Sequence, residues 1–226
     1  MNNKAALLLG GTGLIGSHLL DYLLQSNCYE KINIIVRRPI EISNSKLNQV
    51  IVTDFEGLAD ESYNFAFNVD DVYCCLGTTI KKAGSQEKFH QVDYLFALKA
   101  AQQAKLNGVK QFLIVSSIGA DSYSTFFYSR VKGQLEEALI GLGFPALHVF
   151  RPSLLLGKRK EFRLGEKLAA VLGKLFAPAF IGSLRKYRPI EGKLVACSLY
   201  HNAQEGKSGI HIYQGEQINC NEADNY

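Results

Sequence analysis

Residues 5–16 read AALLLGGTGLIG. The apolar run Ala5–Leu9 leads directly into four glycines within seven residues, Gly10–Gly16, and a helical pattern follows over Ile15–Gln25. Glycine permits the positive φ of a tight turn and a close approach of the backbone to a bound group. A helix that begins there presents unpaired N–H groups. The stretch therefore predicts a strand, a phosphate-binding turn and a helix, the arrangement that holds the pyrophosphate of a dinucleotide.

Apolar runs keep alternating with helical patterns up to about residue 150. Most of the runs are continuously apolar, as strands covered on both faces require. With right-handed connections this order predicts an α/β fold, a Rossmann-like doubly wound parallel sheet with a small C-terminal excursion on the substrate side. The predicted strands are Ala5–Leu9, Lys31–Val36, Gln49–Val52, Asp71–Cys75, Gln111–Val115 and Ala146–Phe150, and the predicted helices are Ile15–Gln25, Val92–Leu106 and Phe126–Leu142.

The length of 226 residues suits one α/β domain and is short for two. We expect a single dinucleotide-binding domain over residues 1–226. Its core should occupy about 1–150, and 151–226 should supply substrate-side segments. Within that last part, Lys158–Arg188 is a basic, partly helical excursion and Gly209–Ile218 is a candidate late strand.

Net charge and hydropathy limit the classes of binding partner that this chain can have. The chain has 25 Lys and Arg against 21 Asp and Glu, a net charge of +4, which is a mild surplus without the dense basic face of nucleic-acid-binding domains. No stretch approaches the roughly 18 apolar residues that cross a bilayer. We therefore expect a small-molecule substrate, no nucleic acid, no membrane, and a monomer or homodimer.

The five cysteines are odd in number and include no CxxC pair. Cys74 and Cys75 lie in an apolar run, as free thiols inside a strand would. We interpret all five as structural residues, which predicts no metal site and a reducing, cytoplasmic location.

The end of the second predicted strand distinguishes between the two nicotinamide dinucleotides. NAD enzymes place an acidic residue there for the ribose 2′-hydroxyl, whereas this chain has Arg37 and Arg38. Two guanidiniums suit the 2′-phosphate of NADP(H), which they can grip bidentately. Asp54 is a candidate contact of the adenine amino group, and the small-residue turn after the fourth strand should lie under the cofactor's ribose. The cofactor residues predicted from the turns are Gly10, Gly11, Thr12, Gly13, Leu14, Ile15, Gly16, Arg37, Arg38, Asp54, Leu76, Gly77 and Thr78.

Catalytic candidates follow the fifth strand. Tyr128 and Lys132 are four residues apart on a predicted helix and share one face. A free phenol has a pKa near ~10, and a neighbouring ammonium would stabilise its phenolate. Tyr128 is thus a candidate general acid or base, and Lys132 its electrostatic partner. A hydroxyl from Ser116 or Ser117 could position the substrate; we prefer Ser117, although adjacent strand residues leave the choice open.

These residues, in this order, resemble the short-chain dehydrogenase/reductase superfamily. Four stretches resemble an atypical branch of it: CCLGTT (74–79), SSIGAD (116–121), YSRVKG (128–133) and VFRPSLLLGKR (149–159). The resemblance implies that Tyr128 is the proton acceptor and that Tyr128 and Lys132 also contact NADP(H). It adds two contacts from the segment after the sixth strand, Leu155 and Arg163.

Two functions of different classes remain open. The favoured one is an NADP(H)-dependent oxidoreductase acting on an unidentified carbonyl or alcohol. The other is a non-catalytic NADP(H)-binding regulator that senses redox state. The Tyr128/Lys132 pair favours the enzyme, because regulators of this kind commonly lack it.

Overall fold

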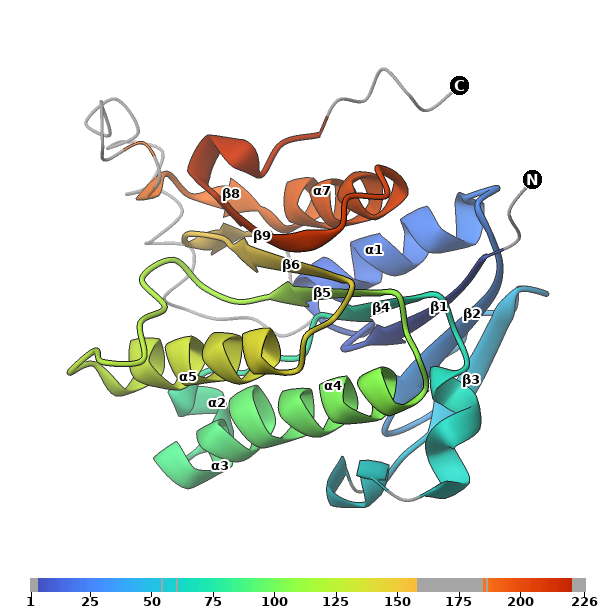
Figure 1. The fold of residues 1–226 in the computed structure, drawn as a ribbon, viewed down its shortest axis with the longest axis horizontal. Coiled ribbons are helices and arrows are strands. Elements are labelled where there is room, and N and C mark those ends of the chain that lie inside the picture. Colours follow the sequence, from blue (N-terminus) through green and yellow to red (C-terminus); the bar gives the residue numbers. More distant parts are fainter. Residues whose placement is uncertain (1–3, 54, 60, 158–184, 186, 221–226) are drawn as a thin grey trace.

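A seven-stranded sheet runs through the middle of the molecule and confirms the predicted fold class (Figure 1). The structure is a computed structural model and describes residues 4–53, 55–59, 61–157, 185 and 187–220. The strands are β1 (Lys4–Leu9), β2 (Tyr29–Val36), β3 (Leu47–Ile51), β4 (Asp71–Cys74), β5 (Gln111–Val115), β6 (Ala146–Arg151) and β9 (Gly209–Gln214). Their order is β3-β2-β1-β4-β5-β6-β9, and every neighbouring pair is parallel.

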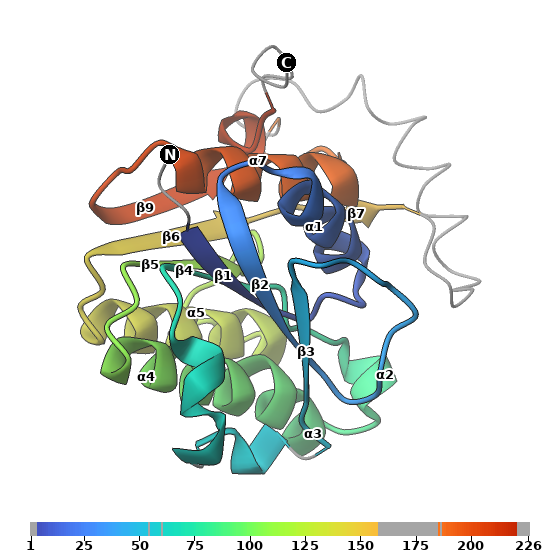
Figure 2. The ribbon, with the colours of Figure 1, turned by 90° about the vertical axis from the view of Figure 1, so that its right-hand side faces the viewer.

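Helices cover both faces of the sheet, as Figures 1 and 2 show from two directions. One face carries α1 (Leu14–Gln25) and α7 (Gly192–Gln204). The other carries α4 (Ala97–Leu106) and α5 (Phe127–Gly141). The shorter elements are the helices α2 (Ile80–Ala83) and α3 (Gln86–His90), the 3-10 turns η1 (Phe55–Ala59), η2 (Glu61–Phe67) and η6 (Gly215–Gln217), the π-helical segment η3 (Gln91–Phe96), and the strand pair β7 (Leu155–Leu156) and β8 (Ile190–Glu191).

The continuous apolar runs are explained by this two-sided cover. Leu7 and Leu9 of β1 pack into the core on the α4 and α5 side, whereas Ala6 and Leu8 pack with α1 and α7. Successive side chains of a strand point to opposite faces, so a strand between two helical layers needs apolar residues at every position.

The structure differs from the sequence prediction mainly after residue 90. The first part of the predicted helix Val92–Leu106 belongs to the π-helical segment η3. The rest of that predicted helix is the α-helix α4. The late strand ends at Gln214 and not at Ile218. Helix α7 and the strand pair β7–β8 were not predicted. Most of the predicted basic excursion lies outside the described residues.

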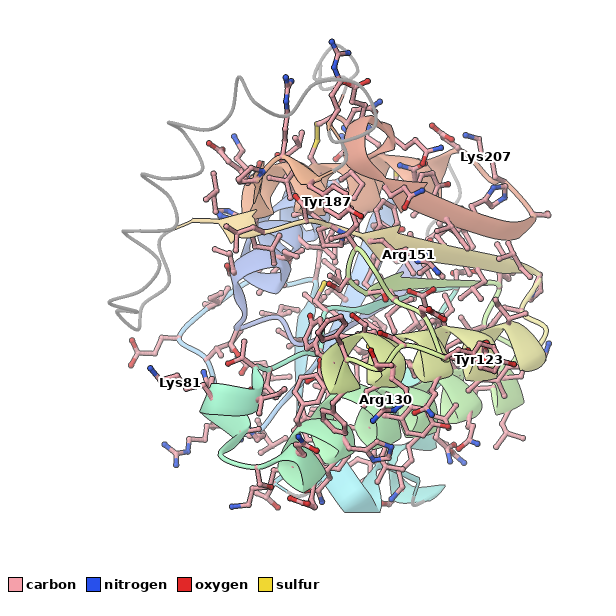
Figure 3. The ribbon with its side chains drawn as sticks, turned by 90° about the vertical axis from the view of Figure 1, so that its left-hand side faces the viewer. Lys81, Tyr123, Arg130, Arg151, Tyr187 and Lys207 are labelled. Carbon is pink, nitrogen blue, oxygen red and sulfur yellow. A yellow bond between two sulfur atoms is a disulfide. The ribbon has the colours of Figure 1, made fainter. Side chains whose placement is uncertain are left out.

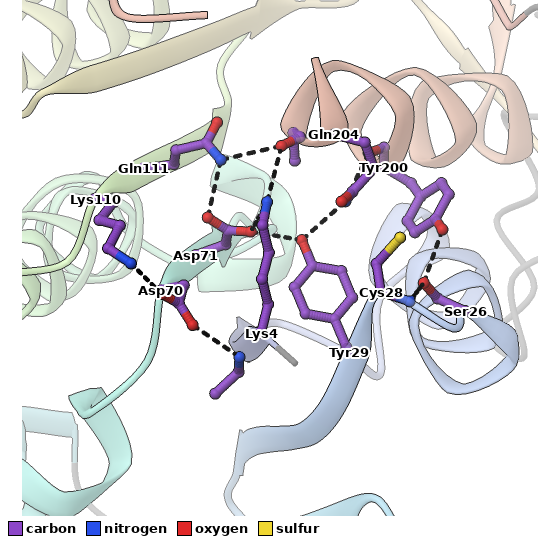
Figure 4. A network of polar contacts seen from close by, with 12 residues as sticks. Lys4, Ser26, Cys28, Tyr29, Asp70, Asp71, Lys110, Gln111, Tyr200 and Gln204 are labelled. Carbon is purple, nitrogen blue, oxygen red and sulfur yellow. Dashed lines mark hydrogen bonds and ion pairs between the residues drawn. The ribbon is translucent and has the colours of Figure 1, made fainter. Parts of the chain in front are cut away.

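A polar network occupies the amino ends of the strands, opposite the edge where the predicted site residues lie (Figure 4). Asp71 of β4 is buried, accepts a hydrogen bond of 2.7 Å from the Tyr29 hydroxyl, and accepts one of 2.9 Å from Gln111 Nε2. Lys4 Nζ forms an ion pair with Asp71 Oδ2 at 3.3 Å. Burial raises the pKa of Asp71, although these partners oppose the shift. Each member forms at least one hydrogen bond or ion pair with another, so the network stabilises the fold, although Gln111 Oε1 is buried without a hydrogen-bond partner among the described residues.

The structure pairs two of the five cysteines, which the sequence analysis did not predict. Cys197 and Cys220 form a disulfide, drawn in yellow in Figure 3. Cys28, Cys74 and Cys75 are free, as predicted for the pair in the apolar run. Burial raises the pKa of the Cys74 thiol to about 11 and that of Cys75 further, so neither is a thiolate at neutral pH.

Candidate cofactor and active site

The carboxyl ends of the parallel strands bring the predicted site residues to one edge of the sheet. The chain leaves β1 for α1 on one face and leaves β4 for α2 and α3 on the other. Neighbouring strands whose connections diverge in this way leave a crevice at their carboxyl ends, the usual dinucleotide site of open α/β sheets.

The glycine turn packs too tightly for side chains. Gly10 has φ +77°, and a Cβ there would lie 2.5 Å from the carbonyl oxygen of Cys75. A Cβ on Gly16 would lie 2.2 Å from the Gly10 carbonyl oxygen. The turn is therefore held against the end of β4 and the start of α1, and larger residues at these positions would force it open.

The start of α1 presents an open anion-binding end. Gly13 is the N-cap, the first turn has no acidic residue, and Thr12 and Gly13 are exposed. The first N–H groups of a helix lack intrahelical partners and carry a partial positive charge. Leu14 is half-buried and packs against Gly157 and Gly192, so the C-terminal part closes on this turn. These features fit the pyrophosphate of a dinucleotide.

Arg37 and Arg38 follow β2 at the same edge and are both exposed. Within the described part of the chain, neither guanidinium forms an ion pair or hydrogen bond with a protein group. Two exposed cations that form no ion pair with any described protein group are available to an anionic ligand.

The remaining predicted cofactor contacts divide into three groups. Leu76, Gly77 and Thr78 follow β4 at the crevice, and the Thr78 N–H donates a hydrogen bond of 2.8 Å to Asp93 Oδ2. Leu155 lies in β7, half-buried against the α1 side of the core. Asp54 and Arg163 lie outside the described residues.

One face of α5 carries the two catalytic candidates. The Tyr128 ring packs on Phe89, with ring centroids 5.3 Å apart. Lys132 is buried, and its Nζ lies 2.8 Å from Oδ1 of Asp93, whose side chain is 1% exposed. Burial alone would lower the pKa of Lys132, but the charges of Asp93 and Tyr128 outweigh it and raise that pKa. Lys132 therefore stays an ammonium beside Tyr128 at neutral pH.

Asp93 was missed by the sequence reasoning. It lies in η3 and joins two parts of the site, because one carboxylate oxygen binds Lys132 of α5 and the other accepts from the turn after β4. The sequence did hold a signal. Phe89, Asp93 and Ala97 are four residues apart, and all three are buried, so an acid falls on the apolar stripe of a helical pattern. A buried carboxylate needs a partner, which points to a nearby cation.

The structure separates the two serines. Ser116 is buried and donates a hydrogen bond to Glu136, which also forms a two-pronged pair with Arg151, at 3.0 Å from Nε and 2.5 Å from Nη2. Arg151, labelled in Figure 3, is the last residue of β6. Ser117 is half-buried, and among the described residues its hydroxyl contacts only the adjacent Ile118 carbonyl, at 3.2 Å. The Ser116 hydroxyl is thus engaged by a side chain, and that of Ser117 is not.

Comparison with known proteins agrees with this geometry. A family model described as NAD(P)H-binding matches residues 10–141, more than half of the chain. The chain belongs to this NAD(P)H-binding family. Protein HTATIP2 of Rattus norvegicus is 44% identical over 172 residues, 75% of this chain and 70% of the relative. Protein FMP52-1 of Scheffersomyces stipitis is 35% identical over 205 residues, 89% of this chain and 88% of the relative.

Solved structures confirm the fold. MoeE5 in complex with UDP-glucose and NAD superposes with a TM-score of 0.69 at 14% identity, over 95% of this chain and 79% of MoeE5. A UDP-N-acetylglucosamine 4-epimerase from Methanobrevibacter ruminantium gives 0.69 at 16% identity, over 95% and 77%. At such identities the likeness concerns the fold alone, and both matches agree with a Rossmann-like fold.

The comparisons also correct the predicted location. Several yeast relatives, 32–40% identical to this chain, are named as mitochondrial proteins, which contradicts the cytoplasmic prediction. That prediction rested on the odd number of cysteines and the absence of a CxxC pair, whereas two of the five cysteines form a disulfide. None of the described helices is long and apolar enough to cross a membrane.

Proposed function

We propose that this chain is an NADP(H)-dependent oxidoreductase of the short-chain dehydrogenase/reductase type, acting on a carbonyl compound or alcohol. The observation that carries the proposal is the buried pair of Lys132 and Asp93, 2.8 Å apart, with Tyr128 on the same helix face. A buried ion pair is costly to assemble, and here it keeps a cation beside a phenol at the crevice next to the glycine turn.

The residues at the crevice support a dinucleotide. The turn Gly10–Gly16 and the first N–H groups of α1 would hold its pyrophosphate, and Leu76, Gly77, Thr78 and Leu155 would line its ribose and nicotinamide half. The exposed pair Arg37 and Arg38 would hold the 2′-phosphate. The bound cofactor supplies or accepts the hydride.

Tyr128 would move the proton. Its hydroxyl donates to the carbonyl oxygen in reduction and, as phenolate, accepts from the alcohol in oxidation. Lys132 stabilises the phenolate by its charge, and Asp93 keeps that charge in place. Ser117 would hold the substrate oxygen, since the Ser116 hydroxyl already donates to Glu136.

A turnover screen tests the function. The full chain is incubated with NADPH and a panel of aldehydes, ketones and quinones, and oxidation is followed by loss of nicotinamide absorbance. We expect turnover with at least one carbonyl class. Tight NADPH binding with no turnover across the panel would favour a redox-sensing regulator, because such a protein needs the cofactor and no substrate.

Cofactor preference tests the arginine pair. We expect the chain to bind NADPH more tightly than NADH, and Arg37→Ala/Arg38→Ala to weaken NADPH binding about 10- to 100-fold with little effect on NADH, because charge-assisted hydrogen bonds to the 2′-phosphate are lost. Calorimetric titration measures both. Lys31→Ala is the matched control, since it removes an exposed cation from the amino half of the same strand. Equal affinity of the unaltered chain for the two cofactors would refute this role.

A further inference from the structure

Two cysteines and a histidine gather away from the dinucleotide crevice. Cys197 and His201 are four residues apart on α7, so they share one face of the helix. Cys220 follows η6 and forms the disulfide with Cys197, on the α7 side of the sheet (Figure 3). One ligand atom from each of the three residues lies within 4.8 Å of the other two. The proposed hydride and proton transfer uses none of them.

The chemistry of this donor set is that of a zinc site. Thiolate sulfur and imidazole nitrogen are the ligands that zinc prefers, and their mutual approach suits one small cation between them. Two of the three donors stand on one rigid helix, which fixes their spacing before any ion binds. Cys220 and His201 are half-buried, so an ion can reach them, whereas Cys197 is buried.

The histidine supplies an independent observation. Its Nε2 atom is shielded from solvent and has no hydrogen-bond partner among the described residues. A buried polar atom without a partner costs stability, and such atoms are rare in folded proteins. Coordination to a cation held by the neighbouring sulfurs would remove that cost.

We propose that, when the disulfide is reduced, Cys197, His201 and Cys220 bind one divalent cation of the zinc class. A dithiol reductant supplies two electrons and two protons, which convert the disulfide to two thiols while the reductant becomes a disulfide. Binding of the cation then displaces the two thiol protons, and the sulfurs bind as thiolates. The three protein ligands leave one tetrahedral position for water.

The disulfide and the bound metal are alternative cross-links between α7 and the segment that contains Cys220. Either one ties α7 to the chain that follows β9. The first residue of α7, Gly192, packs on Leu14 at the start of α1. The cross-link therefore also stabilises α7, the helix that packs against the glycine turn. The cross-link is therefore a disulfide in the oxidised chain and a bound metal ion in the reduced chain, and the two segments stay joined in both.

Cobalt binding tests the site on the full chain. The protein is reduced with a phosphine, freed of metal, and titrated with Co²⁺ as a spectroscopic probe. We expect one ion per chain, a thiolate-to-cobalt charge-transfer band, the intense visible bands of tetrahedral cobalt, and displacement by Zn²⁺. The oxidised chain should show none of these. Absence of the bands in the reduced chain would overturn the proposal.

Variants and thermal unfolding complete the test. Cys197→Ser and Cys220→Ser should each abolish the charge-transfer band of a two-thiolate site, and His201→Gln should weaken binding at least about tenfold. Cys28→Ser, which removes a free thiol outside the cluster, should bind as the unaltered chain does. A measurement that needs no variant is the unfolding temperature of the reduced chain, which Zn²⁺ should raise. An unchanged unfolding temperature, or unaltered binding by Cys220→Ser, would contradict the site.

Discussion

Tyr128→Phe is expected to lower kcat about 100- to 10,000-fold while NADPH binding stays nearly unchanged. The change removes one oxygen and keeps the ring, so the packing on Phe89 at 5.3 Å is preserved. Without the hydroxyl no group on this face of α5 can pass a proton to the substrate oxygen, since Lys132 is held by Asp93. Steady-state rates with a substrate from the screen, and NADPH titration, measure the two quantities.

Tyr123→Phe is the matched control for that experiment. Tyr123 is 89% exposed in the turn before α5, so the same chemical change there should leave both kcat and cofactor affinity unaltered. If Tyr128→Phe instead kept full activity, Tyr128 would have no part in proton transfer. If it abolished NADPH binding as well, its role would lie in holding the cofactor.

The parts of the fold that could be predicted are those with a strong local signal. The strands β1, β2, β4, β5 and β6 are mostly apolar runs, and the structure places each within two residues of the predicted bounds. Helix α7 has no such signal, because its buried face includes Ser198 and Asn202 among the apolar residues. These polar groups are satisfied within the helix, where Asn202 Nδ2 donates to the Ser198 carbonyl. Burial of that kind depends on tertiary contacts and not on hydrophobic periodicity.

The site was only partly predictable for a related reason. Glycine turns, the arginine pair and the Tyr/Lys spacing are local patterns, and the strand order brings them to one edge. Asp93 and the engagement of Ser116 by Glu136 depend on which elements meet across the crevice. The disulfide likewise joins residues 23 apart that no short spacing marks. A sequence indicates such pairs only indirectly, as polar residues on apolar faces.

Asp93→Leu is expected to reduce the free energy of unfolding by about 3–5 kcal/mol, the usual cost of leaving one member of a buried pair without its partner. Lys132 is 4% exposed, so its ammonium cannot regain water when the carboxylate is gone. The Thr78 N–H would lose its acceptor as well. Urea unfolding followed by circular dichroism measures the change.

Two further variants distinguish the buried charge from loss of a side chain. Lys110→Met breaks the ion pair with Asp70, which is of similar length at 2.6 Å but 73% exposed on the lysine side, and should lower the free energy of unfolding far less than Asp93→Leu does. Asp93→Leu/Lys132→Met removes both buried charges and should regain most of the stability lost by Asp93→Leu, while remaining inactive. A cost for Asp93→Leu as small as that of Lys110→Met would contradict a buried, uncompensated ammonium. The pair would then not be what keeps Lys132 charged beside Tyr128, and the argument for its catalytic role would lose its physical basis.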